Sequence, residues 1–155
     1  MKTYPVEFIL NGERRRAEVT ACETLLQVLR DKLGAKDVKN GCAKGDCGAC
    51  TVLLEGDPVN ACLTLAAQAN GKEIVTVRGV GTEENPHPLQ NNFVQYGAIQ
   101  CGFCTPGQII TAKALLDRNP NPDREEIREA ISGNLCRCTG YNKIVEAIEA
   151  TANEG

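Results

Sequence analysis

The sequence predicts an α+β protein with two small domains, a sheet-and-helix domain followed by an all-α four-helix bundle. Polar and apolar residues alternate near the N-terminus, as they do in half-buried strands. Beyond residue 88, apolar residues recur at helical spacing in four segments. A polar stretch rich in glycine, glutamate and proline separates the two patterns. We therefore expect domains at residues 1–78 and 89–155, joined by a linker at residues 79–88.

The composition and net charge of the chain argue against some classes of function. The chain has 155 residues, 42% of them hydrophobic, and a net charge of −3, so it lacks the basic excess that nucleic acid or an anionic membrane attracts. Residues 1–16 contain one short apolar stretch, broken by Glu7, and no small-residue cleavage site. We expect no signal peptide, no transmembrane span and a cytoplasmic protein, in which nine cysteines favour metal ligands over disulfides.

The first domain is expected to begin with a β-hairpin. Residues 4–19 alternate in polarity on both sides of Asn11-Gly12, and such a pair between alternating runs is a strong hairpin signal. A helix is expected at residues 23–33, with Gly34 as its C-terminal cap. Short β-branched runs then predict strands at residues 51–54 and 74–77.

The second domain is expected to consist of four short helices. Thr105-Pro106 is typical of a helix start, and Asp123 is placed to cap another helix. The predicted helices span residues 89–99, 106–117, 123–132 and 141–152.

Four cysteines of the first half have a specific spacing. Cys42, Cys47 and Cys50 follow the pattern C-x4-C-x2-C, and Cys62 follows after eleven residues. This is the ligand pattern of plant-type 2Fe-2S proteins. Glycines allow such a loop to wrap tightly and to direct backbone N–H groups at the sulfurs. The glycines expected to do so are Gly41, Gly45 and Gly48.

The second half contains a second candidate metal site. Cys101-x2-Cys104 and Cys136-x-Cys138 each lie at the junction of a loop with a predicted helix. Residues two apart on a helix point in different directions, so Cys136 and Cys138 must lie on a turn, which the neighbouring glycines permit. We expect the two loops to face each other across the bundle.

Other metal groups fit these cysteines less well. A structural zinc site is the plain alternative, and Cys101-x2-Cys104 has a zinc-knuckle spacing. A Rieske centre needs two histidines and the chain has only His87, while c-type haem needs a C-x-x-C-H motif that is absent. A 4Fe-4S cluster stays open for the second group, although its C-x2-C-x2-C run is missing.

Two further residues are expected to play no part in a site. His87 lies between two prolines and is interpreted as a surface or turn residue, and Cys22 as a small, partly buried core residue. The chain also has no nucleophile–base pairing, no Walker loop and few aromatic residues, so we expect electron transfer without a substrate site of its own.

Taken together, these motifs resemble the iron–sulfur subunit of the xanthine dehydrogenase family of molybdenum hydroxylases. The resemblance extends over nearly the whole chain, and it implies an N-terminal β-grasp, ferredoxin-like 2Fe-2S domain followed by a four-helix-bundle 2Fe-2S domain. The segments that carry it are GCAKGDCGACTV, NACL, AIQCGFCTPG and GNLCRCTGY.

The resemblance also implies a function. Electrons would pass from a molybdopterin centre on a large subunit through the C-terminal cluster, then the N-terminal cluster, to FAD on a medium subunit or another acceptor. Gln100 and Cys138 correspond to positions that contact the pterin, and the complex is expected to be a dimer of the heteromeric unit. The implied ligands are Cys42, Cys47, Cys50 and Cys62 for one cluster and Cys101, Cys104, Cys136 and Cys138 for the other.

The main alternative is a free-standing two-cluster ferredoxin. A diffusible carrier usually has a strongly acidic surface that steers its encounters, and a net charge of −3 is weak for that role. The family oxidises N-heterocycles, aldehydes and other substrates on its large subunit, so we expect an N-heterocycle or an aldehyde as the substrate of the complex.

Overall fold

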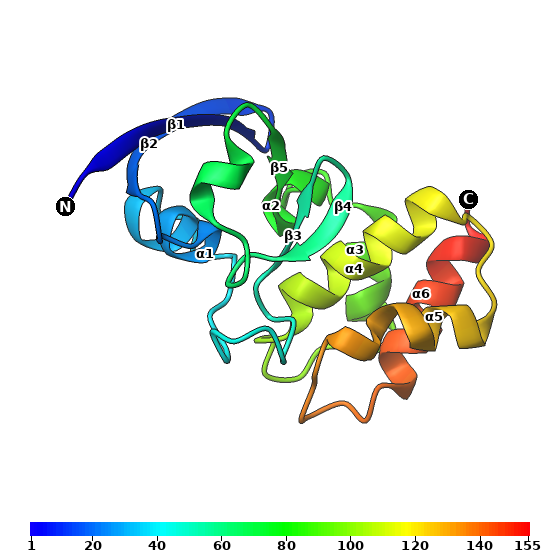
Figure 1. Cartoon of the computed structure of the whole chain (residues 1–155). Coiled ribbons are helices and arrows are strands. Elements are labelled where there is room, and N and C mark those ends of the chain that lie inside the picture. The colour runs from blue at the N-terminus through cyan, green and yellow to red at the C-terminus, as the bar shows by residue number, and fades with distance from the viewer.

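A computed structural model describes all 155 residues, with a sheet in the N-terminal half and helices in the C-terminal half (Figure 1). The chain begins with the expected hairpin, made of β1 (Thr3–Leu10) and β2 (Glu13–Thr20). Its two-residue turn holds Asn11 at φ 51° and Gly12 at φ 83°. Positive φ at both turn residues matches the right-handed twist of the strands, which explains the Asn-Gly signal.

The sheet has five strands in the order β2-β1-β5-β3-β4. The added strands are β3 (Thr51–Leu54), β4 (Asp57–Asn60) and β5 (Glu73–Val75). Only the β1–β5 pair is parallel. A short helical segment, formed by α1 (Leu25–Gln27) and a π-helical turn (Val28–Lys32), buries four side chains in the core of this domain. The arrangement is the expected β-grasp, with one core of 17 buried residues.

Three local features differ from the sequence expectations. The strand expected at residues 74–77 ends at Val75, because residues 77–80 form the short helix α2 (Val77–Val80). The edge strand β4 was not expected, since Asp57 and Pro58 are poor strand formers, but an edge strand tolerates proline. Cys22 is exposed, so its interpretation as a core residue was wrong; it lies on the turn after β2.

The four expected helices of the second half are confirmed with shifted ends. Capping explains two of the starts, because the Asp123 side chain accepts from the N–H of Glu126, and the His87 side chain accepts from the N–H of Leu89. They enclose a second core of 11 buried residues. The helices are α3 (Pro88–Gln95), α4 (Thr105–Arg118), α5 (Arg124–Ala130), which continues as a 3₁₀ turn (Ile131–Gly133), and α6 (Asn142–Asn153).

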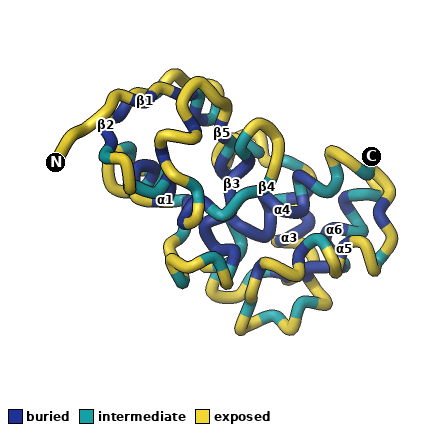
Figure 2. Tube along the Cα trace, viewed as in Figure 1, coloured by how far each residue is buried: buried dark blue, intermediate teal, exposed yellow.

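Helix α4 joins the two halves. Figure 1 shows it beside β3 and β4, and Figure 2 shows buried residues on both sides of this contact. Leu53 of β3 packs there against Ile110 and Ala114 of α4 as a small third core. No helix combines the length and the apolar character that crossing a membrane requires. The division into domains at residues 79–88 stays a proposal.

Candidate metal centres

The first cysteine group lies where a loop enters and leaves the sheet. Cys42 and Cys47 are half-buried on the loop before β3. Cys50 immediately precedes β3, Cys62 follows β4, and both are buried. The side chains meet in pairs, Cys42 with Cys47 and Cys50 with Cys62, and Cys47 also lies near Cys50. The structure therefore brings these thiols together as two neighbouring pairs, and their assignment to one cluster stays a proposal.

Backbone N–H groups surround the sulfur of Cys42. The amides of Lys44, Asp46 and Cys47 lie 3.5, 3.3 and 3.4 Å from Cys42 Sγ, and the amide of Ala49 lies 3.4 Å from Cys47 Sγ. These donors, with Lys44 contributing most, lower the pKa of the Cys42 thiol to about 6. The loop thus stabilises a thiolate at this position, and a thiolate is the form that binds metal.

The loop glycines act in two ways. Gly45 and Gly48 have φ of +87° and +70°, which favours glycine, as expected. Gly41 does not need a positive φ: a Cβ there would lie 2.7 Å from Cys47 Sγ. Its expected role therefore needs correction, since it is the close approach of the thiol that requires a glycine at this position.

The second cysteine group brings the two expected loops face to face. Cys104 is the N-cap residue of α4, and Cys101 lies three residues before it. Cys136 and Cys138 lie on the turn between the 3₁₀ turn and α6. The side chain of Cys104 meets that of Cys136, and the side chain of Cys138 meets that of Cys101.

Thr139 and Tyr141 shape the second group, and neither was singled out from the sequence. The Thr139 hydroxyl and amide donate to Cys136 Sγ at 3.1 and 3.5 Å, and the Cys136 amide donates to the Tyr141 hydroxyl at 2.9 Å. Burial opposes ionisation of Cys136, but the two donors of Thr139, the Cys138 backbone and the Cys104 side chain together lower the pKa of the thiol. Tyr141 itself has φ 70°, which closes the turn before α6.

Each group also contains a thiol whose ionisation is opposed by its surroundings, the buried Cys50 and the half-buried Cys104. Burial raises the pKa of Cys50 to about 11 and that of Cys104 to about 12. A buried thiolate needs a nearby cation, and iron supplies that charge. The pairwise meeting of thiols suits a 2Fe-2S cluster, which takes four cysteines shared between two irons. The residues present therefore fit one such cluster in each group.

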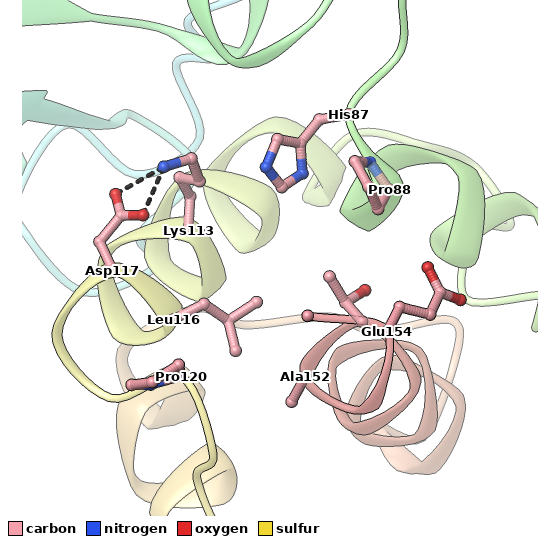
Figure 3. Close-up of a pocket in the computed structure, with 10 residues that line it drawn as sticks. His87, Pro88, Lys113, Leu116, Asp117, Pro120, Ala152 and Glu154 are labelled. Carbon is pink, nitrogen blue, oxygen red and sulfur yellow. Dashed lines mark hydrogen bonds and ion pairs between the residues drawn. The ribbon is translucent and has the colours of Figure 1, made fainter.

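The remaining expected residues lie apart from these thiols or at the surface. Gln100 is exposed beside the exposed Cys101 and Cys138. His87 starts α3, where its Nδ1 accepts from the Leu89 amide at 3.1 Å. It lines a cavity of about 250 Å³ between α3, α4 and α6, opposite the ion pair of Lys113 and Asp117 (Figure 3).

Comparison with known proteins matches two family models to the chain, one after the other. The family model of a 2Fe-2S iron-sulfur cluster binding domain matches residues 8–74, and that of a second 2Fe-2S binding domain matches residues 76–149. The nicotinate dehydrogenase small FeS subunit of Eubacterium barkeri is 51% identical over 148 residues, covering 96% of this chain and 94% of that protein. The nicotine 6-hydroxylase small subunit of Paenarthrobacter nicotinovorans is 49% identical, with coverage of 92% and 86%.

Solved structures agree with these relatives. Quinoline 2-oxidoreductase from Pseudomonas putida 86 contains a chain with a TM-score of 0.93 and 42% identity, covering 100% of this chain and 99% of that one. The aldehyde oxidoreductase of Desulfovibrio desulfuricans matches with a TM-score of 0.94 and 45% identity, but this chain covers only 17% of it. The chain belongs to the small iron–sulfur subunits, with two 2Fe-2S domains, of the xanthine dehydrogenase family of molybdenum hydroxylases.

Proposed function

We propose that this chain transfers electrons between a molybdopterin centre on a large subunit and FAD on a medium subunit, or another acceptor. Two clusters would be held by Cys42, Cys47, Cys50 and Cys62 and by Cys101, Cys104, Cys136 and Cys138. The pairs of meeting thiols carry this proposal, because each pair would ligate one iron. The clusters supply reversible one-electron storage.

The surface near the second group favours a subunit over a free ferredoxin. Cys101, Cys138 and Gln100 are exposed there. Beside these cysteines in the sequence, Phe103 is 47% exposed and Leu135 is 53% exposed. Exposed ligands beside large apolar side chains favour burial by a partner protein. We assign this surface to the large subunit and keep Gln100 and Cys138 as the proposed pterin contacts.

The surface near the first group supports a second contact. Leu63 and Leu65, next to Cys62, are 63% and 40% exposed, and Leu63 packs against Gly45 of the cysteine loop. An apolar surface at this position suits the medium FAD subunit or another acceptor. Electrons would then enter at the second group and leave at the first.

We also propose a wider assembly with separate large and medium subunits and a dimer of the heteromeric unit. Two relatives are named as small subunits and a third as the beta subunit of a complex, which supports larger partners on separate chains. Relatives named for nicotinate, nicotine and quinoline favour an N-heterocycle as substrate, with an aldehyde as the second candidate. We place the complex in the cytoplasm.

Ligand substitutions test the assignment. Cys50→Ser should abolish the electron paramagnetic resonance (EPR) signal of one cluster, and Cys104→Ser that of the other, each with a loss of about half the iron. Cys22→Ser is the matched control, because Cys22 is exposed and belongs to neither group, and it should leave both signals intact. A full signal in either ligand variant would contradict the assignment. Co-purification of the wild-type chain with molybdenum and flavin would separate a subunit from a free ferredoxin.

A further inference from the structure

A buried polar network lies between the two domains. Its four side chains are at least nine-tenths buried: Thr51 of β3, Gln108 and Thr111 of α4, and Asn134 from the loop before Cys136. Buried polar side chains carry a desolvation cost unless they are hydrogen-bonded, so a cluster of them at one contact indicates a specific role. The electron-transfer function does not by itself require polar groups here, since Leu53, Ile110 and Ala114 already form an apolar contact between the domains.

Asn134 is the centre of this network and is only 4% exposed. Its Nδ2 donates to the Gly48 carbonyl at 3.0 Å and to Thr51 Oγ1 at 3.3 Å. Its Oδ1 accepts from the Thr111 hydroxyl at 2.8 Å, and its main-chain carbonyl accepts from Gln108 Nε2 at 2.9 Å. One side chain therefore binds the first cysteine loop, strand β3 and helix α4 together.

The network lies directly beside thiols of both groups. Gly48 follows Cys47, and Leu135 separates Asn134 from Cys136. The Leu135 amide donates to the Cys47 carbonyl at 2.9 Å, so the two cysteine loops are hydrogen-bonded to each other. A shift of Asn134 would move both loops. Its hydrogen-bond partner Gly48 follows Cys47 of the first group, and Asn134 itself lies two residues before Cys136 of the second group.

Close backbone packing leaves little freedom at this junction. A Cβ on Gly48 would lie 2.3 Å from the Gly133 carbonyl oxygen, and a Cβ on Gly107 would lie 2.4 Å from the Gly48 carbonyl oxygen. Apolar contacts are non-directional and tolerate sliding, whereas hydrogen bonds depend steeply on angle and distance. The polar network therefore sets the register between the loops, while the apolar contact supplies attraction.

We propose that Asn134 is a positioning residue that fixes the distance and orientation of the two clusters relative to each other. The inference rests on the proposed function, because it assumes a cluster in each cysteine group. Asn134 contacts no thiol among the hydrogen bonds it forms, so its effect is on the arrangement of the two loops and not on ligation. Removing its side chain should leave both clusters in place and loosen the geometry between them.

The test uses the full chain with both clusters reduced. Two reduced clusters are both paramagnetic, and the splitting of their EPR signals depends on their separation and orientation. Asn134→Ala should lose or alter this splitting while iron and sulfide per chain stay at the wild-type level. Thr111→Val, which removes one hydroxyl and keeps the side-chain shape, should shift the splitting in the same direction by less. Thr111→Ser, which retains the hydroxyl, should restore the wild-type spectrum.

Asn92 supplies a matched control. It is 2% exposed in α3, and its side chain donates to Thr151 at 3.0 Å and to Glu154 at 3.1 Å, between helices that carry no cysteine. Asn92→Ala removes a buried asparagine of equal size but should leave the splitting unchanged. The same splitting in Asn134→Ala and in wild type would overturn the proposal, as would an equal change in Asn92→Ala.

Hydrogen exchange read by mass spectrometry gives a readout that does not depend on the clusters. Asn134→Ala should speed exchange in peptides containing residues 47–51 and 134–136, and Asn92→Ala should not. If Asn134→Ala loses iron, Thr111→Val decides the question, because it changes no loop residue. Fewer than about four irons in the wild-type chain would contradict the proposed function, whereas four irons with unchanged splitting and exchange in Asn134→Ala would contradict this inference alone.

Discussion

The hydroxyl of Thr139 should raise the reduction potential of the second cluster. It donates to Cys136 Sγ at 3.1 Å and accepts from the Tyr141 amide at 3.2 Å. Reduction adds negative charge to the cluster and its thiolates, so a donor to sulfur stabilises the reduced form more than the oxidised form. Thr139→Val keeps the shape of the side chain and the amide donor but removes the hydroxyl.

The magnitude follows from the strength of one hydrogen bond. Bonds to charged groups contribute about 1.5–3 kcal/mol, and only the difference between the two oxidation states counts, so about 1 kcal/mol is the relevant quantity. For a one-electron couple, ~59 mV corresponds to a factor of ten, or ~1.4 kcal/mol. The potential of the second cluster should therefore fall by about 40 mV in Thr139→Val.

An EPR-monitored redox titration of the full chain measures both potentials in one sample. The first cluster serves as an internal reference, because Thr139 lies in the second cysteine group and hydrogen-bonds to Cys136. Thr139→Ser, which keeps the hydroxyl, should retain the wild-type potential. An unchanged or raised potential of the second cluster, or an equal shift in both clusters, would refute the reasoning.

Two further predictions concern stability. Gly48→Ala should lower the melting temperature more than Gly56→Ala. Both positions have positive φ, which costs a non-glycine residue about 1–2 kcal/mol, but only a Cβ at Gly48 would meet a backbone oxygen, at 2.3 Å. Equal melting temperatures of the two variants would contradict the close packing at Gly48. Burial and the nearby Lys113 lower the pKa of His87 below 6.5, although Asp117 opposes them. The unfolded state therefore binds more protons than the folded state, and the free energy of unfolding falls as the pH falls from 6.5 through the folded-state pKa of His87. The melting temperature of His87→Asn, which keeps a capping acceptor, should show no such decline relative to wild type, and a parallel decline in both proteins would exclude His87 as its source.

Local signals explain what the sequence predicts well. The turn at Asn11-Gly12 and the cap at Asp123 depend on residues within a few positions, and both appear as expected. Cysteine spacing likewise places thiols on loops that close on themselves. By contrast, the bond between Asn134 and Gly48 joins residues 86 positions apart, which no local pattern reports.

The positions misinterpreted from the sequence share one physical cause, which is that tertiary structure overrides local preference. Cys22 looked like a core residue because free cysteines are usually buried, but the turn after β2 places it at the surface. Val77 was expected to end a strand because valine favours strands, yet Val77 and Val80 pack against the helical core as part of α2. Tertiary packing overrides propensity at these positions. It also brings the Thr139 hydroxyl to Cys136 Sγ, a contact that the sequence alone does not indicate.

A metal analysis of the anaerobically purified chain tests the presence of two 2Fe-2S clusters most directly. Iron, acid-labile sulfide and zinc should be determined per chain, with EPR spectra recorded after dithionite reduction. We expect about four irons, four sulfides, no stoichiometric zinc and two distinct rhombic signals. Zinc without sulfide, or a single cluster with the Cys101 group empty, would contradict this expectation.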